Sequence, residues 1–168
     1  MLGKTLTALW LLAGLPGISL AATGGQYDSE NMPLCHIYVA AAEFQLYPRL
    51  LHSLYLTEGG KKGWANRNSS NGSLDHGPFQ INSIHLARLG QYGIDGKMLA
   101  SDSMINARVA AWRLKSEIIL AGGNVWKGVG NYRSKTPKYH NEQIMRVANK
   151  YNSLPDIDYR GFCYGSAR

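Results

Sequence analysis

The sequence has 168 residues, with 18 Lys and Arg against 11 Asp and Glu and a formal net charge of +7. This length is enough for one domain with its own hydrophobic core, and no repeat or low-complexity segment divides it. The basic residues are spread along the chain, so their charge favours an anionic polymer as binding partner. Nucleic acid is one such polymer, but no recognition-helix or RNA-binding pattern is present, and the export signal described next argues against it.

The first 21 residues have the pattern of a secretory signal peptide. Lys4 precedes an apolar segment at 6–15, and Ser19-Leu20-Ala21 forms a small-x-small cleavage pattern. An uncleaved anchor is the alternative, although the apolar segment is shorter than the roughly 20 residues that a membrane-spanning helix needs. Cleavage after Ala21 leaves a mature chain without a membrane span, with 17 basic and 11 acidic residues. We expect this chain to be periplasmic.

Two cysteines, Cys35 and Cys163, lie near opposite ends of the mature chain. An oxidising compartment favours a disulfide between them, and two separate buried thiols are the alternative. Neither cysteine has a histidine placed by sequence to activate it as a nucleophile.

Helical periodicity runs through almost the whole mature chain. It predicts helices at 35–44, 48–58, from Asn82 or Ser83 onward, 102–121, 125–132 and 137–151. Pro48 suits the first turn of its helix, and Gly122-Gly123 end the long one. The polar stretch 66–75 lacks this pattern, and Asn71-Gly72 within it predicts a turn or a short hairpin.

The predicted fold class is therefore mainly α, a single domain with one irregular loop or hairpin beside its functional cleft. The predicted organisation is a signal peptide at 1–21, an N-terminal leader at 22–33, the helical domain at 34–153 and a C-terminal tail at 154–168, tied by the disulfide.

The candidate acid is Glu58, which ends an apolar helical run directly before Gly59-Gly60. The negative end of the helix dipole and the apolar neighbours would both raise the pKa of this carboxyl. Lys61 and Lys62 follow closely and would lower the pKa if they faced it. A Glu at a helix end is often structural, so this feature alone leaves both roles open.

Three motifs in order carry a resemblance to the lytic transglycosylases. They are Glu58-Gly59-Gly60, the segment 71–85 with Gly77-Pro78-Phe79-Gln80-Ile81-Asn82 at its centre, and Val129-Gly130-Asn131-Tyr132. The chain is similar to the small, specialised members that accompany secretion, pilus and conjugation machines. The resemblance covers about residues 35–151 and implies a lysozyme-like fold. It also implies cleavage of the β-1,4 bond between N-acetylmuramic acid and N-acetylglucosamine, with formation of a 1,6-anhydro end.

The resemblance implies a mechanism with a single carboxyl group. Glu58 would protonate the departing glycosidic oxygen, and the N-acetyl group of the sugar would stabilise the positive centre. Glu58 would then deprotonate the C6 hydroxyl that closes the anhydro ring. Such double duty needs a pKa near the working pH.

Substrate-binding roles for the other motif residues follow from the same resemblance. Gln80 and Asn82 offer amide groups to sugar hydroxyl and N-acetyl groups, with loop bracing and helix capping as the alternatives. Tyr132 matches the family tyrosine whose hydroxyl approaches the catalytic Glu, with core packing as the alternative. Gly77 would let the backbone pass close to substrate or take a conformation that a side chain forbids, and Phe79 would form an apolar wall.

The chain departs from the family pattern at three positions. Gly59 stands where many members have Ser, so a hydroxyl contact is absent. Phe79 replaces the commoner Met and keeps an apolar surface. Arg133 replaces the commoner Asn and adds positive charge near the cleft, where peptide carboxylates or solvent are its expected partners.

Two other functions remain open. A hydrolytic lysozyme needs a second carboxylate, and Asp75 lies 17 residues after Glu58. An Asp in this loop pattern also commonly braces a turn by accepting backbone hydrogen bonds. A non-catalytic peptidoglycan-binding assembly subunit would use the groove only for docking, a role that has no need of an isolated acid.

No metal or cofactor is expected. The five histidines show no paired ligand spacing, and the glycine pairs lack a phosphate-binding pattern. The expected partners are peptidoglycan glycan strands and components of a secretion, pilus or conjugation apparatus.

Overall fold

The computed structural model describes residues 29–68 and 71–164. The predicted signal peptide at 1–21 and the first part of the predicted leader lie outside these residues. Within them, no helix combines the length and the apolar character that crossing a bilayer requires.

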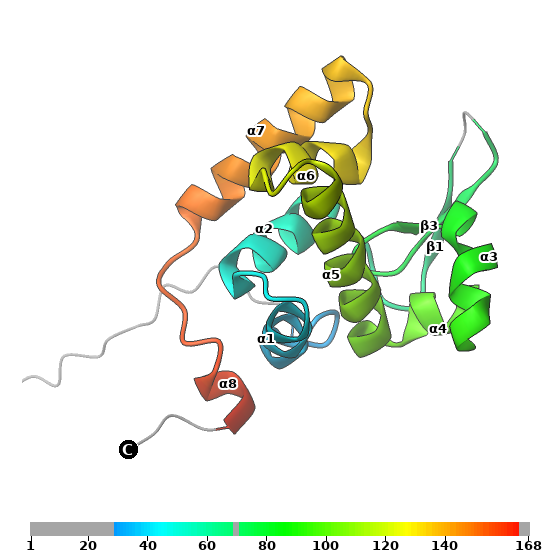
Figure 1. Cartoon of the computed structure of the whole chain (residues 1–168). Coiled ribbons are helices and arrows are strands. Elements are labelled where there is room, and N and C mark those ends of the chain that lie inside the picture. Colours follow the sequence, from blue (N-terminus) through cyan, green and yellow to red (C-terminus); the bar gives the residue numbers. More distant parts are fainter. Residues whose placement is uncertain (1–28, 69–70, 165–168) are drawn as a thin grey trace, which may run out of the picture.

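Five helices enclose the hydrophobic core (Figure 1). They are α1 (Leu34–Glu43), α2 (Pro48–Glu58), α5 (Ser103–Leu120), α6 (Val125–Arg133) and α7 (Pro137–Ser153). The long helix α5 lies at the centre with α1 and α6 against it, and α7 packs on both α2 and α6. Fully buried side chains from these helices meet in one cluster that includes Leu54, Leu114 and Val147. The mainly α fold class is thus confirmed, in a single domain.

The helix ends follow local capping rules. Asp102 begins α5 by accepting hydrogen bonds from the backbone N–H groups of Met104 and Ile105, at 2.9 and 3.0 Å. Asn124 begins α6 in the same way, through the N–H of Lys127 at 2.9 Å. Gly122 follows α5 with a φ of +69°, which glycine adopts without strain. These signals explain why the sequence predicts the long helices to within one or two residues.

A small antiparallel sheet lies beside α5 and joins three short strands in the order β1-β2-β3 (Figure 1). The strands are β1 (Ala65–Arg67), β2 (Leu74–His76) and β3 (Ile81–Asn82). Asp75 of β2 lies between Asn66 of β1 and Asn82 of β3. The predicted hairpin around Asn71-Gly72 is confirmed as the connection between β1 and β2.

Short helices complete the domain. The helix predicted from Asn82 begins as a 3-10 turn (Ser83–His85) and continues as α3 (Leu86–Leu89) and a second 3-10 turn (Gly90–Tyr92). The helices α4 (Gly96–Ser101) and α8 (Gly161–Tyr164) have no counterpart in the sequence prediction, because so few residues give no clear periodicity.

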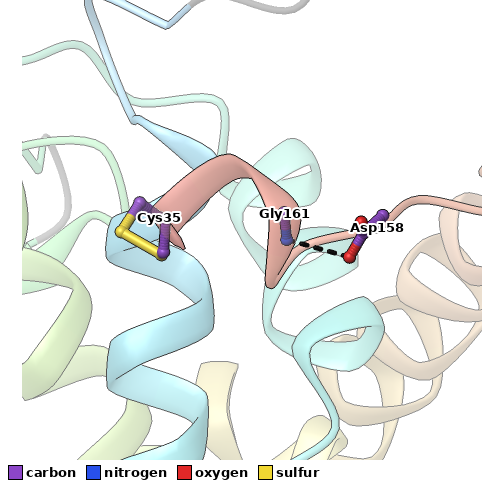
Figure 2. The surroundings of a disulfide bond; sticks show 4 residues. Cys35, Asp158 and Gly161 are labelled. Atoms are coloured by element: carbon purple, nitrogen blue, oxygen red, sulfur yellow. Dashed lines mark hydrogen bonds between the residues drawn. A yellow bond between two sulfur atoms is a disulfide. The ribbon is translucent and has the colours of Figure 1, made fainter. Parts of the chain in front are cut away.

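A disulfide between Cys35 of α1 and Cys163 of α8 holds the C-terminal segment on the domain (Figure 2). The two cysteines are 128 residues apart in sequence, and their pairing confirms the sequence prediction. Figure 2 also shows Asp158, whose side chain accepts a 2.9 Å hydrogen bond from the backbone N–H of Gly161 where α8 begins. The disulfide thus fixes α8 to α1, and the Asp158 side chain fixes the start of α8.

Candidate active-site cleft

A cleft of about 670 Å³ opens between the sheet side of the domain and helices α5, α6 and α7. Its charged lining consists of two acids, Glu58 and Asp75, and three arginines, Arg113, Arg133 and Arg146. The acids come from the end of α2 and from β2, whereas each arginine comes from a different helix. The fold thus brings together charged groups that are far apart in sequence.

Glu58 is the last residue of α2, and Gly59 ends this helix in the left-handed conformation with a φ of +64°. The carboxyl is partly buried. Withdrawal from water raises its pKa from the ordinary 4.5 to about 6, against the opposing effects of a hydrogen bond and nearby arginines. The predicted direction of the shift is confirmed. Lys61 and Lys62 are not among the opposing charges, because they line a separate groove beside Trp64.

Gln143, on α7, is the hydrogen-bond partner of Glu58. Its fully buried side chain donates from Nε2 to Oε1 of Glu58 at 2.7 Å. Its own Oε1 is buried and has no hydrogen-bond partner among the described residues. No motif in the sequence predicts a role for this residue. Its only signal was a polar side chain four positions before Val147, on the buried face of α7.

Tyr132 lines the cleft together with Glu58 and is close enough to it for the carboxyl to influence the pKa of the tyrosine. Its hydroxyl donates to the backbone oxygen of Phe79 at 3.2 Å, and burial raises its pKa well above the ordinary range, so it stays protonated. The guanidinium carbon of Arg113 lies 4.3 Å from the centre of the Tyr132 ring, and this arginine also donates to the Tyr132 backbone oxygen at 3.0 Å. The side-chain hydrogen bond to the Glu58 carboxyl comes from Gln143.

Gln80 lines the cleft, and both ends of its amide are engaged by the protein. Nε2 donates to the backbone oxygen of Gly77 at 2.8 Å, and Oε1 accepts from Nδ2 of Asn66 at 3.0 Å. These bonds hold Gln80 at a φ of +50°, which is unusual for a residue with a side chain. Loop bracing, the alternative in the sequence analysis, is therefore an observed role of this residue.

The substrate contacts predicted for Gly77 and Phe79 are wrong for this structure, because both residues are buried. The other role predicted for Gly77, a conformation that a side chain forbids, is confirmed. Gly77 has a φ of +66°, and a Cβ at this position would lie 2.7 Å from Nδ2 of Asn106. The Phe79 ring is fully buried, and its centre lies 5.8 Å from the centre of the Tyr55 ring. Both residues support the Gln80 loop from behind.

Asn106 of α5 ties this loop to the helical core, and sequence reasoning gave no sign of it. Its side chain is fully buried. Nδ2 donates to the backbone oxygens of His76 and Leu99 at 3.0 and 2.9 Å, and Oδ1 accepts from the N–H of Phe79 at 2.8 Å. One amide thus satisfies three buried backbone groups.

Asn82 and Asp75 line the opposite wall and bind each other. Asn82 caps the following 3-10 turn by accepting from the N–H of Ile84 at 3.0 Å, and its Nδ2 donates to Asp75 Oδ1 at 2.7 Å. The same Nδ2 donates to Ser73 Oγ at 2.8 Å. Asp75 therefore accepts from a side-chain amide rather than from the backbone groups that the sequence pattern predicts.

Across 29–68 and 71–164, no group of three His, Cys, Asp or Glu side chains is arranged to hold a metal ion. The described residues of the cleft include one carboxyl of raised pKa, three arginines and several amides held by hydrogen bonds.

The structure thus defines a mainly helical, single-domain protein with a polar cleft built around a partly buried acid. The chain is 31% identical over 113 residues to Protein IpgF of Shigella sonnei, covering 67% of this chain and 74% of that protein. It is 33% identical over 107 residues to Invasion protein IagB of Salmonella typhimurium, covering 64% of this chain and 66% of that protein. No protein-family model matches the chain. The chain belongs to the family of IpgF.

Proposed function

We propose that the protein is a peptidoglycan lytic transglycosylase with Glu58 as its catalytic acid and base. It would cleave the β-1,4 bond between N-acetylmuramic acid and N-acetylglucosamine and leave a 1,6-anhydro end. The observation that carries this proposal is the carboxyl of Glu58, with a pKa raised to about 6, at the wall of a cleft of about 670 Å³. A carboxyl of this pKa gives and takes a proton near neutral pH, as a single-acid mechanism requires.

The proposed reaction needs no water. Protonated Glu58 gives its proton to the glycosidic oxygen as the bond from this oxygen to the anomeric carbon breaks. The N-acetyl oxygen of the muramic acid residue stabilises the positive anomeric carbon. Ionised Glu58 then removes the proton of the C6 hydroxyl, whose oxygen forms the new bond to the anomeric carbon, and the carboxyl ends the cycle protonated.

Gln143 supports this cycle through its position. While Glu58 is ionised, Nε2 of Gln143 donates to it at 2.7 Å and fixes the orientation of the carboxylate. When Glu58 is protonated, the unpartnered Oε1 of Gln143 is the nearby group of the opposite polarity. Rotation of the Gln143 amide, so that Oε1 in place of Nε2 faces Glu58, would therefore let the same side chain hydrogen-bond to both protonation states of the acid.

The proposal also includes the cellular compartment and the apparatus that the protein serves. The relative in Salmonella typhimurium is called an invasion protein, and the sequence resembles transglycosylases of secretion, pilus and conjugation machines. We place the mature chain in the periplasm, where it would open the wall locally for such an apparatus.

Hydrolysis is the second candidate, because Asp75 lines the same cleft as Glu58. In a hydrolytic lysozyme the second carboxylate acts as nucleophile, stabiliser or base. The hydrogen bond from Asn82 to Asp75 favours a structural role for this residue instead.

The mass of the products from purified peptidoglycan tests the proposal. Transglycosylation gives anhydro ends, which are lighter by one water than the reducing ends of hydrolysis. We expect anhydro products from the parent and none from Glu58→Gln, whose amide keeps the shape of the side chain but cannot donate the proton. Reducing ends as the main product would favour hydrolysis. Cleavage of peptidoglycan by Glu58→Gln would show that Glu58 is not the catalytic acid.

A further inference from the structure

Three arginines converge on the cleft from three different helices. Arg113 lies on α5, Arg133 is the last residue of α6, and Arg146 lies on α7. All three are close enough to Glu58 to lower the pKa of its carboxyl electrostatically. They therefore share one electrostatic environment with the proposed acid.

These arginines have no carboxylate partner within the part of the chain that the structure describes. The ion pair found there joins Arg108 and Glu43 at 2.6 Å, and neither residue lines the cleft. Arg113 and Arg146 each donate to a backbone oxygen, at 3.0 Å to Tyr132 and at 2.7 Å to Thr57. Each of these bonds uses one of the five N–H groups of a guanidinium, so further donors remain.

Arg133 is the most available of the three. It is exposed, and its observed partner is the ring of Tyr139, whose centre lies 5.6 Å from the guanidinium carbon. Contact with an aromatic ring leaves the edge of the guanidinium open for a planar anion. The other two arginines are anchored by hydrogen bonds to backbone oxygens, whereas the observed contact of Arg133 is with an aromatic ring.

The acids of the cleft do not neutralise this charge. Asp75 is held by Asn82 on the sheet side. Glu58 must be protonated to act as an acid, and it then carries no charge. Three positive charges thus face one negative charge when the site is ready to react, a balance that favours an anionic ligand.

We propose that Arg113, Arg133 and Arg146 form a subsite for a carboxylate carried by the muramic acid residue of the substrate. Its source is either the peptide attached to that sugar or, on a sugar without a peptide, the lactyl group, whose carboxyl is otherwise engaged in the amide bond to the peptide. This inference rests on the proposed function, because it names the part of the peptidoglycan strand that the cleft recognises. Carboxylates match the planar fork of arginine and accept two parallel hydrogen bonds from it.

The subsite has a consequence for the acid. The arginines lower the pKa of Glu58, and a bound carboxylate would offset their charge. Substrate binding would therefore raise the pKa of Glu58 and favour its protonated, reactive form. An uncharged polymer of N-acetylglucosamine would lack this effect and would also bind more weakly.

Binding measurements in the Glu58→Gln background test the subsite without cleavage of the ligand. Isothermal titration calorimetry would compare three soluble probes: peptide-bearing glycan strands, strands freed of peptide by an amidase, and chitohexaose, which has no carboxylate. Arg133→Gln should weaken binding of a carboxylate-bearing strand by about five- to tenfold and binding of chitohexaose by less than about twofold. Arg146→Gln should show the same selectivity, and Arg133→Lys should recover part of the affinity through its charge.

Lys127→Gln is the matched control, because Lys127 is exposed on the same helix as Arg133 and does not line the cleft. It should leave all three affinities unchanged within about twofold, since a distant exposed charge is screened by salt. If Arg133→Gln weakens the affinity only for peptide-bearing strands, the bound carboxylate belongs to the peptide. If it weakens the affinity only for peptide-free strands, the carboxylate belongs to the lactyl group.

Two results would overturn the subsite: equal weakening of all three probes by Arg133→Gln and Arg146→Gln, or no weakening by either variant. These outcomes are separate from those of the proposed function, which fails if the parent releases no anhydro products. If the parent releases anhydro products but its binding does not depend on the arginines, the proposed function stands and the proposed subsite is wrong.

Discussion

Gln143 of α7 donates a 2.7 Å hydrogen bond to Glu58 at the end of α2, across a sequence separation of 85 residues. The bond stabilises the ionised form of Glu58 and so opposes the effect of burial on its pKa. The two helices pack against each other, and this contact brings the buried amide to the carboxyl. The protonation of the proposed acid therefore depends on a residue from the far end of the chain.

Replacing Gln143 with Met should raise the pKa of Glu58 above its value of about 6 in the parent. Met keeps the approximate size of the side chain but removes the donor to the carboxylate. The titration of the Glu58 carboxyl carbon, followed by NMR, would report the shift directly. The alkaline limb of the wall-cleavage rate should move to higher pH in parallel, because the acid must begin the reaction protonated.

Val147→Ala is the control for this prediction, since Val147 is fully buried on the same helix and does not line the cleft. It should lower the free energy of unfolding by roughly 2 kcal/mol and leave the Glu58 titration unchanged. Equal titration curves for Gln143→Met and Val147→Ala would show that Gln143 has no specific influence on the acid.

Glu58→Gln should increase stability in a pH-dependent manner. Burial raises the pKa of Glu58 from 4.5 to about 6, so between these pH values the unfolded chain loses its proton before the folded chain does. The contribution of Glu58 to stability therefore falls as pH rises through this window, by at most about 2 kcal/mol. The amide introduced by Glu58→Gln does not titrate, so the stability of the variant relative to the parent should rise over the same range and then level off.

Urea denaturation of the parent and Glu58→Gln at several pH values would measure this difference. A gap between the two proteins that stays constant from pH 4.5 to about pH 7 would contradict the raised pKa. The variant should also keep its affinity for peptidoglycan, since its fold and its arginines are intact.

Asp75→Asn should reduce stability slightly and leave the chemistry unchanged. An amide oxygen at this position can still accept the hydrogen bond from Asn82, but without a negative charge, so the expected loss is about 1 kcal/mol or less. Products should retain 1,6-anhydro ends, as mass spectrometry would show. Loss of cleavage in a fully folded Asp75→Asn protein would instead assign Asp75 a direct part in the reaction.

Asn106→Leu should be strongly destabilising. The substitution leaves buried backbone groups of three residues, His76, Leu99 and Phe79, without their hydrogen-bond partner. At about 1 kcal/mol or more for each group, the free energy of unfolding should fall by at least about 3 kcal/mol. Ser116→Ala on the same helix removes a hydrogen bond to Trp112 and should cost less than about 1 kcal/mol. Similar losses for the two variants in urea denaturation would contradict a special role of Asn106.

Replacing both Cys35 and Cys163 with Ser should lower stability without changing the activity of the folded protein. The disulfide closes a sequence separation of 128 residues, and chain entropy gives roughly 4 to 5 kcal/mol for a loop of this length. Cleavage assays well below the melting temperature should give equal rates for the parent and the double variant, because neither cysteine lines the cleft. Parent protein recovered from the periplasm should show no free thiol when denatured without reductant, and two labelled cysteines would contradict the bridge.

The sequence by itself determined the long helices, because their signals are local. Proline in a first turn, Asp or Asn at an N-cap and glycine after the last turn act within a few residues, and apolar spacing marks the buried face. Glu58 at the end of α2 and the hairpin at Asn71-Gly72 followed from such signals. The pairing of Cys35 with Cys163 was also predictable, since the sequence has just two cysteines.

Only the tertiary structure decided which groups surround Glu58. Gln143, Arg113 and Arg146 reach it because α2, α5, α6 and α7 pack around one core, and periodicity carries no information on which helix faces meet. The same limit explains the misassigned Phe79, whose motif position suggested a cleft wall while packing buried its ring. Helix propensity and capping depend on neighbours along the chain, whereas burial, hydrogen-bond partners and pKa depend on neighbours in space, which are fixed only when the helices assemble.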